Sequence, residues 1–188
     1  MDPDQLASLA RDIDATCRLT GEFTLRSGQV VSEYFDKYLF EARPELLRRV
    51  AGAMVPRLPP GAELLGGLEL GGVPIATMVS ALTGTPALFV RKKAKTYGTC
   101  RLAEGADVAG RTVVLIEDVI TTGGAVRAAT VALRERGAEV RTVVCAIDRS
   151  PVGSRPLDDV AVGVRAVLTR ADLDRARTSG PPVASAMR

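Results

Sequence analysis

The stretch VLIEDVITTGGAVRAA at residues 114–129 decides the fold of this chain and indicates its chemistry. Three apolar residues run directly into two acids, Glu117 and Asp118, as expected for a buried strand that ends in a polar site. Two threonines and two glycines follow, and an amphipathic helix begins after them. In open sheets of parallel strands, ligands bind beyond the carboxyl ends of the strands. We therefore expect both acids to lie at a solvent-accessible, ligand-binding edge.

The segment Thr121-Thr122-Gly123-Gly124 predicts a phosphate site. Backbone N–H groups at the start of a helix attract anions, threonine hydroxyls add donors, and glycines allow the backbone to approach closely. Two carboxylates beside a phosphate would repel it, unless the ligand keeps its phosphate apart from its hydroxyl groups. A sugar phosphate meets this condition, because the carboxylates can accept hydrogen bonds from ribose hydroxyls. The alternative is that the two acids only cap the helix.

Working outward, apolar runs and helical periods alternate along the chain. We expect strands at 62–67, 86–91, 111–118 and 140–148, and helices at 4–18, from 44, at 74–83 and from 124 to 136. A turn at Ser27-Gly28 joins two extended arms. Alternation of strand and helix predicts parallel pairing with right-handed crossovers, so the fold class is α/β with an open, mainly parallel sheet flanked by helices. The segment from Arg177 to the end has little apolar content and is expected to fray.

Composition narrows the functional classes. The 188 residues suit one domain, and 46% hydrophobic with 25% charged residues is typical of a soluble globular protein. No apolar run is long enough to cross a membrane, and three widely spaced cysteines favour a reducing, cytoplasmic location over disulfides. The complete absence of histidine excludes a Ser-His-Asp triad, a Cys-His dyad and a histidine-ligated metal. A net charge of only +3 is weak support for nucleic-acid binding.

A long loop separates the strands expected at 86–91 and 111–118. Its first part, VRKKAKTYGTCR at 90–101, carries five basic residues. Long loops in compact domains usually serve a function, and a cationic one suits a pyrophosphate group. The alternative is a solvated run of charge without a partner.

These motifs resemble the type I phosphoribosyltransferases, and among them the orotate phosphoribosyltransferases. The string around Glu117 resembles the phosphoribosyl-pyrophosphate motif of the superfamily. Further matches follow in the order of the orotate enzymes and at about their spacing: FTLRSG (23–28), SEYFD (32–36), GLELGGVP (67–74), VRKKAKTYGT (90–99), LAEG (102–105) and AIDRS (146–150). The resemblance implies the type I fold with a small N-terminal hood. It implies transfer of ribose 5-phosphate from phosphoribosyl pyrophosphate to orotate, giving orotidine 5′-monophosphate in pyrimidine biosynthesis.

The resemblance assigns a role to each matching residue. Phosphoribosyl pyrophosphate would be bound by Arg26, Arg91, Lys92, Lys95, Tyr97, Glu117, Asp118, Val119, Ile120, Thr121, Thr122, Gly123, Gly124 and Ala125. Orotate would be bound by Tyr34, Phe35, Thr121 and Arg149. Lys95 and Asp118 would be the catalytic residues. A guanidinium at position 149 can pair with the substrate carboxylate through two hydrogen bonds, and the alternative is a structural ion pair with Asp148.

The resemblance also implies a cofactor and an assembly. Mg²⁺ would be bound mainly through the substrate, without a direct protein ligand. A homodimer is expected, with loop 91–105 reaching the neighbouring site, and neither nucleic acid nor membrane is expected as a partner. We expect one domain over 1–178, divided into a helix and hood segment at 1–40 and an α/β core at 41–178, with a frayed tail at 179–188.

Three positions depart from the family pattern. Tyr97 stands where a loop histidine is common, Leu70 and Gly71 stand where many members have an aromatic residue and a lysine, and Arg26 replaces a lysine. Two other readings therefore stay open. One is a phosphoribosyltransferase that acts on a different base. The other is a regulator that senses phosphoribosyl pyrophosphate, although too few residues precede the first motif for a DNA-binding domain.

Overall fold

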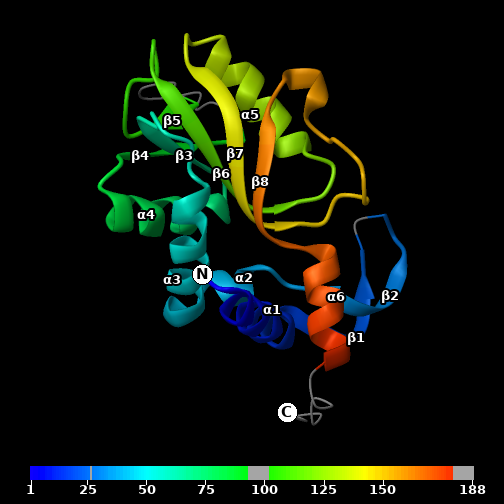
Figure 1. Ribbon diagram of the computed structural model, residues 1–188. Coiled ribbons are helices and arrows are strands. Elements are labelled where there is room, and N and C mark those ends of the chain that lie inside the picture. The colour runs from blue at the N-terminus through cyan, green and yellow to red at the C-terminus, as the bar shows by residue number, and fades with distance from the viewer. Residues whose placement is uncertain (26, 93–101, 180–188) are drawn as a thin grey trace.

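A six-stranded sheet with helices on both faces forms the body of the protein, as the computed structural model shows for residues 1–25, 27–92 and 102–179 (Figure 1). The strand order is β5-β4-β3-β6-β7-β8. The strands are β3 (Leu64–Leu68), β4 (Ala87–Val90), β5 (Ala103–Glu104), β6 (Thr112–Ile120), β7 (Glu139–Asp148) and β8 (Gly163–Thr169). All neighbours pair in parallel except β5, which runs antiparallel to β4. The α/β class with a mainly parallel sheet is confirmed.

Helices cover the sheet on both faces because its central strands are apolar on both sides. Every residue of β3 is buried, and β6 is buried from Val113 through Asp118. The face that carries α3 (Pro44–Met54) and α4 (Gly72–Thr83) shares one apolar cluster, which includes Val50, Ile75 and Ile116. The other face packs against α5 (Gly124–Arg134) in a second cluster that includes Val126 and Leu115. Burial on both sides explains the nearly continuous apolar run in the sequence.

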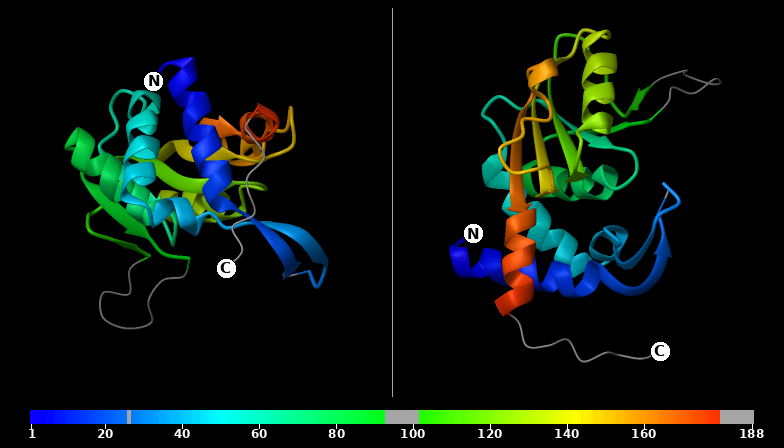
Figure 2. Two further views of the ribbon diagram at one scale, coloured as in Figure 1. Left: turned by 90° about the horizontal axis from the view of Figure 1, so that it is seen from below. Right: turned by 90° about the vertical axis from the view of Figure 1, so that its right-hand side faces the viewer.

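An N-terminal hood lies below the carboxyl ends of the strands (Figures 1 and 2). It consists of α1 (Pro3–Cys17), the hairpin of β1 (Arg18–Thr24) and β2 (Val30–Phe35), and the short α2 (Tyr38–Glu41). Helix α1 begins with a capping box in which Asp2 and Gln5 bond each other's backbone N–H groups, which satisfies donors that a helix start leaves open. Leu9 and Ile13 of α1 are fully buried in the same cluster as α3, so the hood and the sheet share a core.

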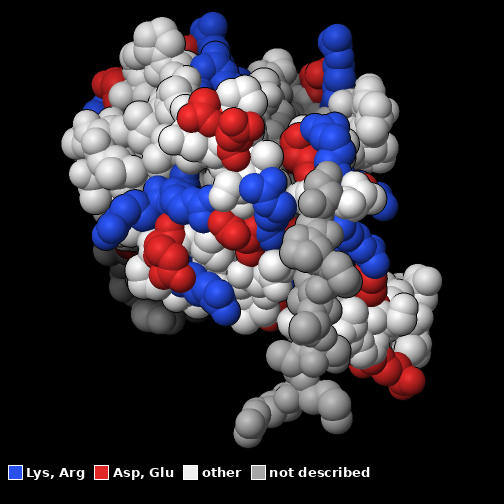
Figure 3. Space-filling view, turned by 60° about the horizontal axis from the view of Figure 1, so that its bottom comes forward, with Lys and Arg blue, Asp and Glu red and all other residues white. Residues whose placement is uncertain are grey.

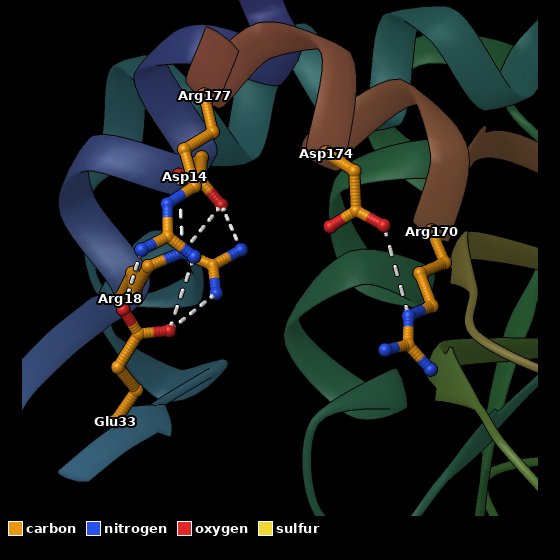
Figure 4. Close-up of polar contacts among 6 residues, drawn as sticks. All are labelled: Asp14, Arg18, Glu33, Arg170, Asp174 and Arg177. Carbon is orange, nitrogen blue, oxygen red and sulfur yellow. Dashed lines mark hydrogen bonds and ion pairs between the residues drawn. The ribbon is translucent and has the colours of Figure 1, made fainter.

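Helix α6 (Arg170–Ser179) follows β8 and returns the chain to the hood, where it packs against α1. Arg177 of α6 and Arg18 of β1 donate to the two carboxylate oxygens of Glu33, at 2.6 and 3.2 Å (Figure 4). Arg18 also pairs with Asp14 at 2.7 Å. This network holds β2 against the C-terminal helix.

Two sequence expectations need correction, and two elements, β8 and α6, were not expected. The strand expected at 111–118 extends to Ile120, because β7 continues to pair with it through Asp148. Strand β8 and helix α6 were not predicted, since β8 is half exposed and α6 buries little besides Leu173. The expected frayed segment is helical up to Ser179, because Arg177 is tied to Glu33. Residues 180–188 lie outside the described part of the chain. No helix among the described residues is long and apolar enough to span a membrane.

Close packing of β3 against α4 generates a first prediction. A Cβ atom at Gly67 would lie 2.7 Å from the backbone oxygen of Gly72 and 2.8 Å from the Cβ of Ala76. We expect Gly67→Ala to lower the free energy of unfolding by about 2 kcal/mol through overpacking. Gly52→Ala is the matched control, because it lies within helix α3 with nothing within 4 Å of the added atom, and it should stabilise by up to about 1 kcal/mol. Urea unfolding measures both, and equal midpoints for the two variants would contradict the packing argument.

Candidate active site

The two acids of the opening stretch lie inside the sheet's carboxyl edge rather than on its surface. Glu117 is 8% exposed and Asp118 is 0% exposed. The expectation of a solvent-accessible pair is therefore wrong for this structure. The reason is that β6 continues past the acids to Ile120, and that the hood and the β3–α4 turn pack over them.

A lysine from the hood pairs with the acid pair. Lys37 Nζ lies 2.6 Å from Asp118 Oδ2, while Asp118 Oδ1 accepts a hydrogen bond of 2.5 Å from the N–H of Val119. Glu41 of α2 is the third buried carboxyl group of the cluster. Among the described residues, Glu41 Oε1 and Glu117 Oε2 are buried without a hydrogen-bond partner. We call Lys37, Glu41, Glu117 and Asp118 the acid cluster.

Burial controls the protonation of the acid cluster. It raises the pKa of Glu117 to about 9, and the negative charge of Asp118 adds to this shift while Lys37 opposes it. It also raises the pKa of Glu41 to about 8, again with a contribution from contact with Asp118. Burial lowers the pKa of Lys37, but the contact with Asp118 and the charge of Glu117 outweigh it, so the net shift is upward. Near neutral pH the cluster therefore centres on one ion pair, with both glutamates largely protonated.

Two glycines of the β3–α4 turn make this close arrangement possible. A Cβ atom at Gly71 would lie 1.9 Å from Asp118 Oδ2 and 2.5 Å from Glu41 Oε1. A Cβ atom at Gly72 would lie 2.3 Å from the backbone oxygen of Ile116. The departure from the family pattern at Gly71 thus has a structural counterpart, because the carboxylates occupy the space that a side chain there would need.

The segment after β6 presents its polar groups to the outside. Thr121, Thr122, Gly124 and Ala125 are exposed, and α5 begins at Gly124. Gly123 has a φ of 73°, and it has no side chain to accept from the first N–H groups of the helix. No side chain therefore caps the first N–H groups of α5, which leaves them available to an anion. Val119 is half-buried and Ile120 is 1% exposed in the core, so their side chains contribute packing.

Two of the predicted pyrophosphate residues lie near this segment. Arg91 and Lys92 line a hollow of about 120 Å³ together with Glu69 and Ala125. The N–H of Lys92 donates to Glu69 Oε2 at 2.9 Å, which fixes the backbone where the cationic loop begins. Arg26, Lys95 and Tyr97 lie outside the described residues.

The predicted orotate residues divide into two groups. The guanidinium of Arg149, after the end of β7, lies over the ring of Phe35 at 5.0 Å from its centroid. Asp148 accepts hydrogen bonds from the N–H and hydroxyl of Ser150 instead, and no ion pair joins it to Arg149 in the part of the chain that is described. Tyr34 points to the other side of β2 and stacks at 5.5 Å on Phe23. The structure therefore brings Phe35 and Arg149 together and leaves Tyr34 apart from them.

The surroundings of Arg149 favour an anionic ligand. Burial lowers its pKa, and the charges of Arg170 and Arg18 lower it further, while Asp174 and Asp14 act in the opposite sense. An arginine stays protonated in spite of such a shift. Acidic and basic side chains are interspersed over the face of the molecule that Figure 3 shows. Because burial is the main cause of the shift at Arg149, a carboxylate that pairs with the guanidinium would offset the cost of its desolvation.

Sequence reasoning missed Lys37 and Glu41. Both follow the SEYFD motif closely, yet neither has a spacing that signals a site. A second hollow of about 440 Å³ was also not expected; it is lined by Gly110, Arg134 and residues 137–141. It lies at the amino ends of β6 and β7, away from the acid cluster, and Arg134 is used there for a bond of 2.7 Å to the carbonyl of Val160.

Comparisons with known proteins agree with this geometry. Residues 64–170 match the family described as phosphoribosyl transferase domain. The orotate phosphoribosyltransferase of Nocardioides sp. (strain ATCC BAA-499 / JS614) is 75% identical over 174 residues, which cover 93% of this chain and 97% of that protein. The orotate phosphoribosyltransferase of Halobacterium salinarum is 39% identical over 170 residues, covering 90% and 95%.

Solved structures agree as well. The Mycobacterium tuberculosis orotate phosphoribosyltransferase in complex with Fe(III) dicitrate aligns with a TM-score of 0.78 at 31% identity, covering 90% of this chain and 98% of that chain. The same enzyme in complex with 5-phospho-α-D-ribosyl 1-diphosphate aligns with a TM-score of 0.74 at 28% identity, covering 90% and 99%.

The raised pKa of Glu41 generates a prediction about stability. A carboxyl group whose folded pKa exceeds its unfolded value holds its proton more tightly when folded, so stability is lost as pH rises from the unfolded pKa through about 8. We expect the free energy of unfolding of Glu41→Gln, relative to that of the wild type, to rise between about pH 5 and 8, by at most about 1.4 kcal/mol per pH unit.

Glu45→Gln serves as its control, because Glu45 is an exposed glutamate of the neighbouring helix α3. Thermal unfolding across this pH range measures both variants. A constant difference between Glu41→Gln and wild type at every pH would contradict the assignment.

Proposed function

The chain belongs to the orotate phosphoribosyltransferases, within the phosphoribosyl transferase domain family, and we propose how its residues carry out that family's reaction. The enzyme transfers ribose 5-phosphate from 5-phosphoribosyl 1-pyrophosphate to orotate. The products are orotidine 5′-monophosphate, a precursor of UMP in pyrimidine biosynthesis, and pyrophosphate. The observation that supports the residue roles best is the convergence of the acid cluster, the open start of α5 and Arg149 at one sheet edge.

Residues 121–125 would bind the 5′-phosphate. The exposed hydroxyls of Thr121 and Thr122 and the first N–H groups of α5 point to donors for a phosphate dianion. Gly123 and Gly124 allow the phosphate to approach the backbone, and the partial positive charge of the helix start attracts it. The side chains of Val119 and Ile120 would act only through packing, since they are partly or fully buried.

Glu117 and Asp118 would accept the ribose hydroxyls once the β3–α4 turn moves away from them, since that turn covers both acids in this structure. Hydrogen bonds to a charged acceptor are about twice as strong as neutral ones, so the ionised Asp118 is the stronger acceptor of the two. As positive charge develops on the ribose ring in the transition state, a nearby carboxylate would stabilise it. This is the sense in which we propose Asp118 as a catalytic residue.

The pyrophosphate would lie toward Arg91 and Lys92, at the edge of the hollow that they share with Ala125. Lys95, Arg26 and Tyr97 would contribute to the same group, on the basis of the family resemblance. Mg²⁺ would neutralise charge on the pyrophosphate as it departs. On the basis of the family resemblance, we propose that Mg²⁺ is bound mainly through the substrate, whose oxygens are the ligands that this cation prefers.

Orotate would bind between the strand ends and the hood. Arg149 would pair with the carboxylate of the base, and Phe35 would cover the ring that Arg149 holds in place. Thr121 is exposed at the end of the adjacent strand β6 and would contact the base from that side. Tyr34 would need to change position to reach the ring, because it stacks on Phe23.

We further propose a cytoplasmic homodimer in which loop 91–105 serves the neighbouring site. The buried free thiols of Cys17 and Cys145 suit a reducing compartment. Within this loop, Arg91 and Lys92 are exposed at the sheet edge, and the chain from 93 to 101 lies outside the described residues.

The role of Arg149 is testable by substitution. Losing a charge-assisted bidentate contact and leaving a desolvated carboxylate unpaired costs roughly 2–5 kcal/mol. We expect Arg149→Ala to lower kcat/KM for orotate by about 10²–10³-fold, while the affinity for phosphoribosyl pyrophosphate barely moves. Steady-state kinetics and calorimetry measure the two effects. Arg155→Ala, at an exposed position, is the control and should leave both unchanged. A smaller loss than about tenfold for orotate would argue against the carboxylate contact.

Subunit mixing tests the dimer. Lys95→Ala and Arg149→Ala are each expected to be poorly active alone. If the loop acts across the interface, each hybrid dimer contains one site with both defects and one with neither, so that the mixture recovers about a quarter of wild-type activity. Failure to recover, with exchange of subunits confirmed by native mass spectrometry, would show that the loop serves its own subunit.

A further inference from the structure

Lys37 is the feature of the acid cluster that the proposed residue roles do not explain. In the described part of the chain, Lys37 is the cation of the acid cluster. Three carboxyl groups surround it, two from β6 and one from α2. Asp118 is 0% exposed, so its charge has no water to stabilise it. An isolated buried carboxylate is strongly disfavoured, and an ion pair of good geometry is what allows it to stay ionised.

Lys37 comes from a part of the chain that also carries the base site. Phe35, at the end of β2, contacts Arg149, and two residues later Lys37 contacts Asp118. Asp36 between them holds the turn, because its carboxylate accepts the N–H of Tyr38 at 3.1 Å. A single short segment of the hood therefore contacts both proposed substrate sites.

A side chain at Gly71 of the β3–α4 turn could not take the place of this lysine at Asp118. Any Cβ atom at Gly71 would collide with the oxygens of Asp118 and Glu41. The groups that face Lys37 are Asp118 and Glu117 of β6, Tyr38 and Glu41 of α2, and the adjoining Asp36 acts on Glu41. None of these groups is basic, so Lys37 supplies the positive charge among them.

We propose that Lys37 is a positioning residue of the transfer reaction: its ammonium group, 2.6 Å from Asp118 Oδ2, holds this carboxyl group in place and supplies its counter-charge, so that the ribose hydroxyls of phosphoribosyl pyrophosphate meet a fixed acceptor. This inference rests on the proposed role of the acid pair. Lys37 acts through Asp118 and does not itself touch the reacting carbon. It also couples the hood to ribose binding, because a displaced hood removes the counter-ion from the site.

The test compares Lys37→Met, which keeps the length of the side chain, with Lys37→Arg, which keeps its charge. Calorimetry measures the dissociation constants of two probes in the presence of Mg²⁺: phosphoribosyl pyrophosphate, and pyrophosphate alone. We expect Lys37→Met to weaken phosphoribosyl pyrophosphate binding by about tenfold at pH 7, and Lys37→Arg to restore most of it. Pyrophosphate lacks the ribose, so its binding should not change.

One further readout separates positioning from a structural role. In an Asp118→Asn background, Lys37→Met should cause no additional loss, and the double variant also avoids burying an unpaired charge if the single variant folds poorly. Arg49→Met is the matched control, because it breaks an ion pair of the same 2.6 Å length, with Asp12, away from the site.

The outcomes are distinct. Affinity of Lys37→Met within twofold of wild type, or a loss that persists in the Asp118→Asn background, would overturn the inference and leave the proposed function standing. If the wild-type protein failed to bind phosphoribosyl pyrophosphate while it bound pyrophosphate, the proposed ribose site would fall together with the inference.

Discussion

Close packing of the β3–α4 turn against β6 is the constraint on which this site depends. Gly71 and Gly72 leave no room for a Cβ atom, since Asp118 and the backbone of Ile116 lie against them. This contact buries the acid pair, and burial in turn determines which carboxyl groups carry charge. The geometry of one turn thus sets the electrostatics of the ribose site, before any ligand is considered.

The two ends of the site then present opposite electrostatic problems. At the acid cluster, three carboxyl groups compete for one ammonium group, and two of them are held largely protonated near neutral pH. At Arg149, burial disfavours the charge of a guanidinium that has no carboxylate partner among the described residues. On the proposed residue roles, ribose hydroxyls would meet the acid cluster and the carboxylate of the base would meet Arg149, so each ligand would be bound where the protein leaves a polar group unsatisfied.

The sequence was sufficient for the central fold because β3, β6 and β7 carry apolar runs and α3 and α5 carry a clear helical period. It was insufficient for β8, which is half exposed, and for α6, which has little apolar content and packs against α1 of the hood. In the site, the string correctly predicted a buried strand that carries the two acids and is followed by a helix start, while the phosphate position stays a prediction. It did not predict their burial, nor Lys37 and Glu41, because contacts between distant parts of the chain leave no periodic signal.

The hood therefore contributes side chains to the site in addition to covering it. Through Glu33 it is bound to Arg177 of α6, through Phe35 it contacts Arg149, and through Lys37 it neutralises Asp118. Glu33 and Phe35 alternate along β2, and a strand directs alternate side chains to the same side. Lys37 lies beyond the end of β2, in helical backbone at the start of α2, and it contacts Asp118 from there. A shift of the hairpin would consequently disturb the proposed base and ribose sites together. The ion pair between Glu33 and Arg177 of α6 therefore helps to hold both sites in place.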